Sequence, residues 1–200
     1  MNIALLGATG KFGITFTTKL LSNPDYQITA ISKSAERIFE DSHRITAKSI
    51  DATNQKELKK VIKDADVVYC AISGEDLPKI AENLVEINVK RLIFLSVVGI
   101  YNELEEGNGA EFNLDNEAEQ IPNRKSVDII EASDLNYTII RSGYLINGKE
   151  DEYIITKKGE TPKGYCSTVE SVLKVSLDII NDAELYSHES ISITRDMTKN

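Results

Sequence analysis

The chain has 200 residues, of which 41% are hydrophobic and 28% are charged, an ordinary composition for a globular protein with one continuous core. The formal net charge of −9 and the lack of any Lys/Arg cluster argue against nucleic-acid binding, because an acidic surface repels phosphate backbones. No apolar run approaches the ~20 residues that span a bilayer, so we expect no membrane association.

The cysteines and histidines argue against two further kinds of site. Cys70 and Cys166 lie far apart and form no CxxC pair, and the short apolar run Ile3–Leu6 lacks the basic flank of a secretion signal. We therefore expect a cytoplasmic protein with reduced thiols. His43 and His188 are distant in sequence from each other and from both cysteines, so we expect no metal site.

Short apolar runs alternate with segments of helical periodicity, a pattern typical of β-α units that build a parallel sheet. The expected strands are Asn2–Leu6, Gln27–Ile31, Arg44–Ser49, Val67–Ile72, Arg91–Ser96 and Tyr137–Arg141. Apolar residues with helical spacing lie between them, at Phe12/Phe16/Leu20, Leu58/Ile62, Leu77/Ile80/Leu84 and Val127/Ile130. The sequence therefore predicts an α/β protein, a Rossmann-type doubly wound parallel sheet of order 3-2-1-4-5-6 with helices on both faces.

One segment within this pattern is unusually acidic. Asn102–Gln120 carries seven acidic residues and no Lys or Arg, and it follows the fifth expected strand. Long loops in compact domains are usually functional or disordered. We expect a long loop here, either a solvated acidic excursion or a functional element.

After Arg141 the pattern changes. Glu152–Lys158 alternates weakly, Thr168–Ile180 has the spacing of a helix, and Ser190–Thr194 could form a last strand. No linker precedes this tail. We therefore assign residues 1–200 to a single domain and expect residues 142–200 to form a small substrate-side extension.

The stretch LLGATGKFG places Gly7, Gly10 and Gly13 between the first strand and the first helix. The first glycine would allow a sharp turn, the second would let backbone approach a pyrophosphate, and the third would let the helix pack on the strand. The helix N-terminus would then offer N–H groups to phosphates. We interpret this loop as a dinucleotide site rather than a plain structural turn, with the candidate residues Gly7, Ala8, Thr9, Gly10, Lys11, Phe12 and Gly13.

The ends of the next strands supply further candidates. Ser32 and Lys33 stand where many NAD sites carry an acidic residue, with Ser34 and Arg37 nearby, so NADP(H) is favoured over NAD(H); alternatively, the two cations simply lie on the surface. Asp51, Ala52, Ala71, Ile72 and Ser73 follow the third strand and end the fourth, where adenine and ribose would lie. Asp51 could accept from the adenine amino group or cap the next helix.

Three blocks of sequence together resemble the atypical short-chain dehydrogenase/reductases, the NAD(P)H-binding branch that includes NmrA-like regulators and the flavin and biliverdin reductases. The blocks are the glycine loop, residues 95–101 (LSVVGIY) and residues 130–143 (IEASDLNYTIIRSG). The last is similar to the family's s-x-L-x-Y-T-I-l-R-P-g strand, with Ser142 where proline is common. The resemblance covers nearly the whole chain, and it implies a nicotinamide ring over the end of the fifth strand, near Ser96, Val97 and Tyr101.

Many short-chain dehydrogenases use a Ser, a Tyr and a Lys, with Tyr-x-x-x-Lys on a helix so that the ammonium lowers the pKa of the phenol. Two spans have a comparable spacing, Tyr137 to Arg141 and Tyr153 to Lys157, but both read as strands. Four residues along a strand cover about 13 Å. We therefore expect neither span to act as a catalytic dyad.

By the family's layout, the remaining catalytic candidates are Ser96, Tyr101 and Lys125. Ser96 would hydrogen-bond a carbonyl oxygen, Tyr101 would donate a proton or stack, and Lys125 would contact the cofactor or stabilise negative charge. The structural alternatives are a strand-end hydroxyl, a packing aromatic and a surface cation. Asn123 stands where relatives often carry an aromatic, and Val169 where they often carry Arg, so substrate handling departs from the family pattern.

Two functions fit these features. The first is an NADPH-dependent oxidoreductase that passes hydride to a small acceptor such as a quinone or flavin, which needs little acid–base machinery. The alternative is a non-catalytic NADP(H)-binding sensor of NmrA type, in which binding orders the 102–120 loop and changes a protein-partner surface. An epimerase or dehydratase is less well supported because a Tyr-x-x-x-Lys motif is missing. The acceptor and the oligomeric state stay open.

Overall fold

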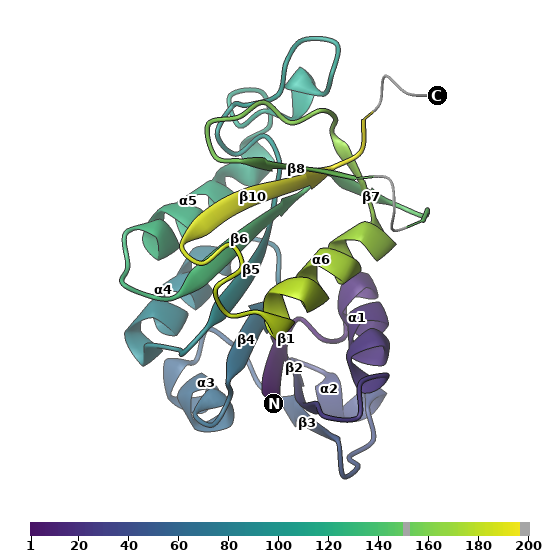
Figure 1. Cartoon of the computed structure of the whole chain (residues 1–200). Coiled ribbons are helices and arrows are strands. Elements are labelled where there is room, and N and C mark those ends of the chain that lie inside the picture. The colour runs from purple at the N-terminus through teal and green to yellow at the C-terminus, as the bar shows by residue number, and fades with distance from the viewer. Residues whose placement is uncertain (150–152, 197–200) are drawn as a thin grey trace.

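The structure is a computed structural model and describes residues 1–149 and 153–196. Its centre is an eight-stranded sheet of order β3-β2-β1-β4-β5-β6-β10-β8, in which only the pairing of β8 with β10 is antiparallel (Figure 1). The strands of this sheet are β1 (Asn2–Leu6), β2 (Gln27–Ser32), β3 (Ile45–Ser49), β4 (Val67–Cys70), β5 (Leu92–Val97), β6 (Tyr137–Ser142), β8 (Ile154–Lys157) and β10 (Glu189–Thr194). Strands β7 (Tyr144–Ile146) and β9 (Cys166–Thr168) form a separate parallel pair.

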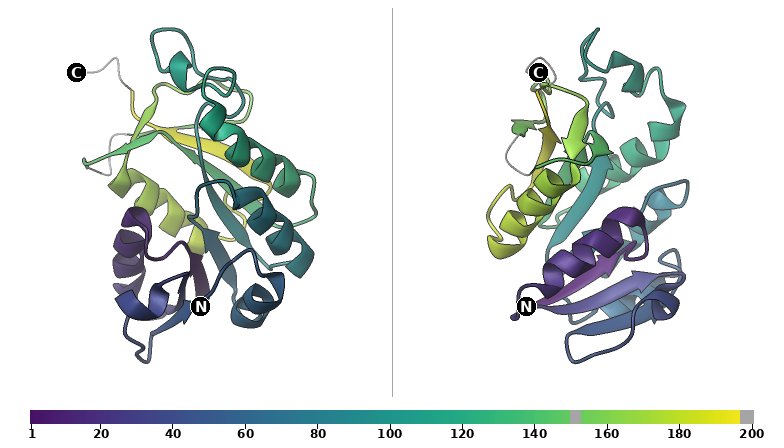
Figure 2. Two further views of the ribbon diagram at one scale, coloured as in Figure 1. Left: turned by 180° about the vertical axis from the view of Figure 1, so that it is seen from behind. Right: turned by 90° about the vertical axis from the view of Figure 1, so that its right-hand side faces the viewer.

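Helices cover both faces of the sheet, and the predicted doubly wound fold with the order 3-2-1-4-5-6 is confirmed (Figures 1 and 2). The helices are α1 (Lys11–Leu21), α2 (Ala35–Ile38), α3 (Gln55–Ile62), α4 (Leu77–Ile87), α5 (Ile121–Glu131) and α6 (Val169–Asn181). Helices α1 and α6 pack on one face, and α3, α4 and α5 pack on the other.

Two hydrophobic clusters explain why the central strands are apolar almost throughout. Successive residues of a strand point to opposite faces, so Leu6 and Phe94 join the cluster under α3, α4 and α5, whereas Leu5 and Ile93 join the cluster under α1 and α6. All four side chains are fully buried. Burial on both faces leaves no place for alternating polar residues in these strands.

The C-terminal segment extends the same sheet. The predicted last strand is β10, which pairs in parallel with β6, and the predicted helix is α6, which begins at Val169 after the N-cap Thr168. Of the weakly alternating span, residues 154–157 form β8, while Glu152 lies outside the described residues. The short strands β7 and β9 have too few residues to show a period in the sequence.

The acidic segment 102–120 is packed against the protein rather than fully solvated. It contains two short 3-10 helices, Ala110–Phe112 and Ala118–Gln120. Asn113 is buried, and its side-chain amide donates to Leu104 O at 2.8 Å and accepts from Leu104 N–H at 3.0 Å. These bonds close the loop on itself.

Within the described residues, none of the helices combines the length and the apolar character needed to cross a bilayer.

Candidate functional site

The three glycines of the first loop have different surroundings. Gly7 has φ +82°, and a Cβ there would lie 2.7 Å from Ala71 O, so any side chain is excluded. A Cβ at Gly13 would collide with Gly7 O, which fixes the close approach of α1 to the loop. At Gly10 the only atom within 4 Å of a built Cβ is Gly7 O, at 3.4 Å. Gly7 and Gly13 are therefore required by the fold, whereas Gly10 opens toward the cleft.

Helix α1 begins beside this opening without a side-chain cap. Gly10 is its N-cap, with φ −68° and ψ 161°, and no side chain accepts from the first turn. The uncapped N–H groups and the helix dipole favour an anion at this end of the helix. Lys11, the first helical residue, adds a cation beside them. These features fit the pyrophosphate of a dinucleotide.

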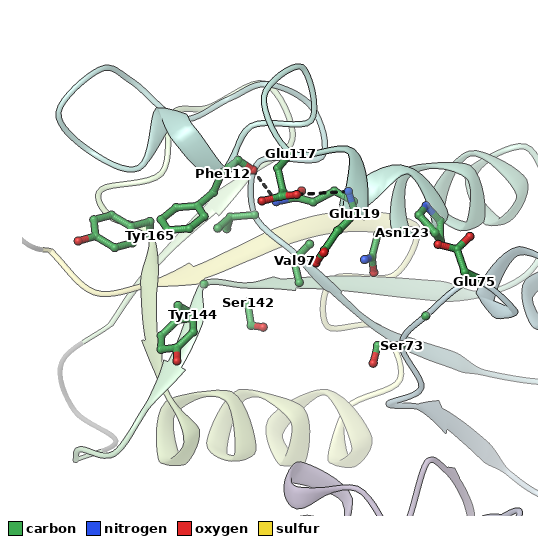
Figure 3. A pocket seen from close by; sticks show the side chains of 15 residues that line it. Ser73, Glu75, Val97, Phe112, Glu117, Glu119, Asn123, Ser142, Tyr144 and Tyr165 are labelled. Atoms are coloured by element: carbon green, nitrogen blue, oxygen red, sulfur yellow. Dashed lines mark hydrogen bonds between the residues drawn. The ribbon is translucent and has the colours of Figure 1, made fainter.

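A cleft of three connected cavities runs along the carboxyl ends of the strands. A central cavity of about 500 Å³ is lined by Gly10, Lys11, Phe12, Gly13, Ala71, Ile72, Ser73, Leu95, Ser96, Val97, Asn123, Ser142, Gly143, Tyr144 and Leu145. A β2-side cavity of about 410 Å³ is lined by Gly7, Ile31, Ser32, Lys33, Ile50, Asp51, Ala52, Ile72, Ser73, Gly74, Glu75, Asp76 and Ile80. An outer cavity of about 550 Å³ shares Val97, Asn123 and Tyr144 with the central one (Figure 3). The cleft crosses the junction of β1 and β4, where the strand order of a doubly wound sheet reverses.

Most of the predicted cofactor residues meet in this cleft. The two exceptions support the loop from behind: Ala8 is fully buried, and the Thr9 hydroxyl donates to Ser32 Oγ at 3.0 Å. Ser32 Oγ also accepts from Ser34 N–H at 3.1 Å. The hydroxyl of Ser32 thus fixes the turn after β2 as well as lining the β2-side cavity.

Lys33 is held by two carboxylates across the β2-side cavity. Its ammonium lies 2.9 Å from Asp51 Oδ2 and 3.7 Å from Asp76 Oδ2, and its side chain is 67% exposed. The hydrogen bond with Asp51 is the main reason that the pKa of Lys33 is raised. Arg37 is exposed on the short helix α2 and does not line the cavity. Asp76 was not among the predicted residues.

Asp51 does not cap the following helix. Asn54 is the N-cap of α3 and accepts from Glu57 N–H at 3.3 Å. The Asp51 carboxylate instead accepts from the Thr53 N–H at 3.0 Å and from the Thr53 hydroxyl at 2.8 Å. Of the two roles considered from the sequence, helix capping is therefore wrong.

These bonds predict an acidic titration of Asp51. The Thr53 N–H, then Lys33 and the Thr53 hydroxyl lower its pKa from the ordinary 3.8 to about 2. Because the folded-state pKa is depressed, this carboxylate stabilises the protein above about pH 4, and the contribution is lost as the pH falls toward 2. We expect Lys33→Ala to raise the pKa only part of the way to 3.8, measured by carbon NMR titration. A return to 3.8 would show that the ion pair, and not the backbone N–H, dominates.

Ser96 lines the central cavity, and Asn123 lines both the central and the outer cavity (Figure 3). The buried Ser96 hydroxyl donates to Asn123 Oδ1 at 3.5 Å, at the outer limit of a hydrogen bond. Such a weak bond leaves both groups available to a ligand. Ser96 is therefore the one predicted catalytic candidate that the structure places in the cleft.

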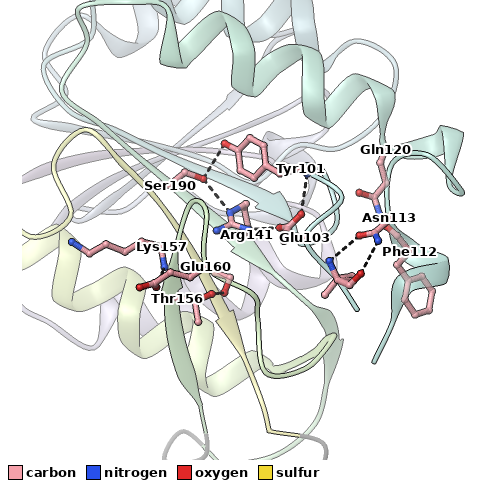
Figure 4. Close-up of polar contacts among 12 residues, drawn as sticks. Tyr101, Glu103, Phe112, Asn113, Gln120, Arg141, Thr156, Lys157, Glu160 and Ser190 are labelled. Atoms are coloured by element: carbon pink, nitrogen blue, oxygen red, sulfur yellow. Dashed lines mark hydrogen bonds and ion pairs between the residues drawn. The ribbon is translucent and has the colours of Figure 1, made fainter. Parts of the chain in front are cut away.

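Tyr101 is placed differently from the prediction. Its hydroxyl lies 3.2 Å from Ser190 Oγ (Figure 4) and donates to Glu131 Oε1 at 2.7 Å. Tyr101 lines none of the three cavities. Arg124, Arg141 and Lys158 lie over its ring within 5.0 Å of the centroid. Burial raises the pKa of the phenol, which makes it a poor proton donor at neutral pH. The structure thus matches the packing alternative for Tyr101.

Lys125 also lies outside the cleft. It is exposed on α5, whereas Pro122 and Asn123 of the same helix line the outer cavity. The sequence placed Lys125 at the correct end of the helix, but the side-chain direction depends on how α5 packs against α4. Its position corresponds to a surface cation.

Several lining residues were missed from the sequence. They are Glu75 and Asp76 after β4, Phe112, Glu117, Glu119 and Gln120 from the acidic segment, and Tyr144, Leu145 and Tyr165 near β7 and β9. The loop after Ser96, the segment after Arg141 and the stretch Lys157–Thr168 all contribute lining residues. No pattern within those segments indicated which side chains turn inward.

Neither cysteine forms a disulfide in the described part of the chain, and both are buried. Burial raises the pKa of the Cys70 thiol to about 12 and also raises that of Cys166. Such thiols are poor nucleophiles at neutral pH.

Comparison with solved structures finds proteins of the same fold. A short-chain dehydrogenase/reductase from Veillonella parvula DSM 2008 in complex with NADP is 27% identical, with a TM-score of 0.87 over 100% of this chain and 96% of that chain. A Rossmann-fold NAD(P)-binding family protein from Shigella flexneri is also 27% identical, with a TM-score of 0.82 over 98% and 94% of the chains. ChuY, an anaerobillin reductase from Escherichia coli O157:H7, shares the fold at 16% identity, with a TM-score of 0.80 over 100% of both chains.

No curated protein matches the sequence significantly. The family model described as NAD(P)H-binding matches residues 7–183, which begins at the first glycine of the loop and includes every residue that lines the three cavities. With the doubly wound sheet and the uncapped α1 terminus, this match shows that the chain belongs to the NAD(P)H-binding family of atypical short-chain dehydrogenase/reductases.

Proposed function

We propose that this protein is an NADPH-dependent oxidoreductase that passes hydride to a small planar acceptor such as a quinone or flavin. The observation that carries the proposal is the continuous cleft, in which the opening at Gly10 leads to a central cavity and then to an outer one. A dinucleotide with its pyrophosphate at Gly10 would reach the boundary near Ser96 and Asn123. The outer cavity would then hold the acceptor against the nicotinamide ring.

The preference for NADP(H) rests on the end of β2. Ser32 and Lys33 stand there without a carboxylate in the same turn, and the Veillonella parvula relative is in complex with NADP. Lys33 is paired with Asp51 and Asp76, but its side chain is mostly exposed. A 2′-phosphate dianion would draw the ammonium from these partners, because charge-assisted bonds to phosphate are strong.

The chain's own residues would mainly bind and orient. When bound, the reduced nicotinamide supplies two electrons and one proton as hydride, and a quinone becomes a hydroquinone after it takes one further proton from water. Ser96 and Asn123 would hydrogen-bond an acceptor oxygen at the boundary of the cavities. No protein acid is required for this reaction, which agrees with the position of Tyr101 outside the cleft.

The proposal is tested by calorimetric titration with NADPH, NADP, NADH and NAD. We expect the phosphorylated pair to bind more tightly and Lys33→Ala to weaken NADPH binding about tenfold, the loss of one charge-assisted bond, while NADH binding stays unchanged. Lys60→Ala, an exposed cation on α3 outside the cleft, is the matched control.

If Lys33→Ala weakens the binding of NADPH and NADH equally, Lys33 does not contact the 2′-phosphate. Cofactor oxidation in the presence of naphthoquinone or free flavin then tests turnover. Tight, redox-selective binding without turnover of any acceptor would favour the sensor alternative.

A further inference from the structure

The outer cavity is lined by negative charge without a compensating cation. Glu75, Glu117 and Glu119 contribute to its wall, and no described Lys, Arg or His does so. Glu117 accepts a hydrogen bond from the Glu119 N–H at 3.4 Å, and none of the three carboxylates is in an ion pair with a described residue. A ligand that enters this cavity therefore meets an unneutralised acidic wall.

Aromatic rings line the same cavity. Phe112 and Tyr165 come from segments far apart in the sequence, and their ring centroids are 5.4 Å apart at a 34° tilt. Tyr144 lies across from them at the mouth, with 70% of its surface exposed (Figure 3). Ring faces bind flat ligands, and they attract cations more strongly than neutral groups.

A buried acceptor adds to the negative wall. Gln120 lines the cavity and is only 8% exposed, and its amide N–H donates to Phe112 O. Its Oε1 has no hydrogen-bond partner among the described residues. A buried carbonyl oxygen without a donor leaves an uncompensated negative partial charge in the wall, which also favours a positively charged ligand.

The backbone fixes these groups in place. Gly109 has φ +91°, and a Cβ there would lie 2.5 Å from Tyr165 Cβ. Gly99 has φ +90° and packs against the Phe112 carbonyl. Gly109 allows the acidic segment to close on Tyr165, and Gly99 allows the turn after β5 to pack against the acidic segment, so the wall is held by close backbone packing.

We propose that the outer cavity selects a planar aromatic acceptor that carries a positive charge and disfavours acceptors that carry carboxylate, phosphate or sulfonate groups. The transfer step rests on the proposed oxidoreductase function: hydride passes to the acceptor ring, which takes one proton from water, and the nicotinamide is oxidised. The charge preference itself concerns binding and can be measured without turnover.

The test uses three 2-methyl-1,4-naphthoquinones that differ only at the end of a propyl tether on C3: trimethylammonium, methyl or sulfonate. The matched rings keep the redox potential nearly constant. Their Kd values for the NADP-saturated protein are measured by calorimetry, where no reaction occurs, and their kcat/KM values are measured with NADPH after blank correction. We expect the order cation, neutral, anion, with about a 30-fold range at low ionic strength that shrinks in salt.

A matched pair of variants separates the cavity from the overall charge. Glu75→Gln/Glu117→Gln/Glu119→Gln should reduce the cation-to-anion ratio to about threefold or less, because it removes the charged wall. Glu105→Gln/Glu106→Gln/Glu111→Gln changes the net charge equally, but these exposed residues of the same segment do not line the cavity, so the ratio should stay as in the parent protein.

The two proposals fail separately. If the Kd order holds but no acceptor is reduced, the charge selection stands and the oxidoreductase function is wrong. If all three quinones are reduced at equal rates with equal Kd values, or the sulfonate is preferred, the oxidoreductase function stands and the charge selection is overturned. Failure of all three to bind also overturns it, as does an equal effect of the two triple variants.

Discussion

Gly10→Asp is expected to weaken NADPH binding by about 100-fold or more while the protein becomes slightly more stable. Asp is a favoured N-cap, and its carboxylate would accept from the N–H groups at the start of α1 that Gly10 leaves uncapped. The same N–H groups are those that a pyrophosphate would bind, so cap and cofactor compete. The loss of two charge-assisted bonds at ~1.5–3 kcal/mol each corresponds to this fall in affinity.

The backbone at this position accepts a side chain. The φ of −68° is available to any residue, and the built Cβ is 3.4 Å from Gly7 O, which requires a shift of only a few tenths of an ångström. With the cap and the helix dipole, the free energy of unfolding should rise by about 0.5 kcal/mol, measured in urea.

Gly10→Ala is the control, because it adds the Cβ without the carboxylate and should weaken binding less. Wild-type affinity for NADPH in Gly10→Asp would mean that the cofactor does not bind at this helix terminus.

Gly7→Ala, in contrast, is expected to destabilise the fold itself, because its Cβ would press on Ala71 O.

Glu103→Ala is expected to lower the free energy of unfolding by about 3–5 kcal/mol, because it leaves a buried guanidinium without its counter-ion. The Arg141 side chain is fully buried, and its Nη1 donates to Glu103 (Figure 4). Glu103 also accepts a hydrogen bond from the Tyr101 N–H at 2.9 Å, so removal of the Glu103 carboxylate leaves this N–H without its acceptor as well. The measurement is a urea titration at neutral pH, read as a change in midpoint at constant slope.

Two comparisons make this result interpretable. Glu105→Ala removes an exposed acid two residues away and should change stability by no more than about 0.5 kcal/mol. The double variant Glu103→Leu/Arg141→Met removes both charges and should recover part of the loss. A single variant as stable as the Glu105 control would show that water or another group compensates the charge of Arg141.

The sequence by itself determined the sheet and the glycine loop. The six main strands are largely apolar because both faces of the sheet are covered, and this local pattern predicted their limits to within two residues. Their order followed from the rule for doubly wound sheets. Gly7 and Gly13 could be assigned because their requirement for no side chain is a property of one short turn. The tail helix and last strand followed from the same kind of local periodicity.

Only the tertiary structure decided which polar side chains meet in the cleft. Lys33 lies between Asp51 and Asp76 because the ends of β2, β3 and β4 converge, and no spacing along the chain encodes that convergence. The Tyr101 side chain points away from the cleft because Glu131 lies close enough to accept a hydrogen bond from its hydroxyl. The polar composition of the acidic segment allowed a solvated loop as one alternative. In the structure, the buried Asn113 side chain holds the segment closed through its hydrogen bonds with the Leu104 backbone. The periodic burial of a strand or helix is encoded by neighbouring residues in the sequence. The direction of a single polar side chain depends instead on partners that only the folded chain brings near.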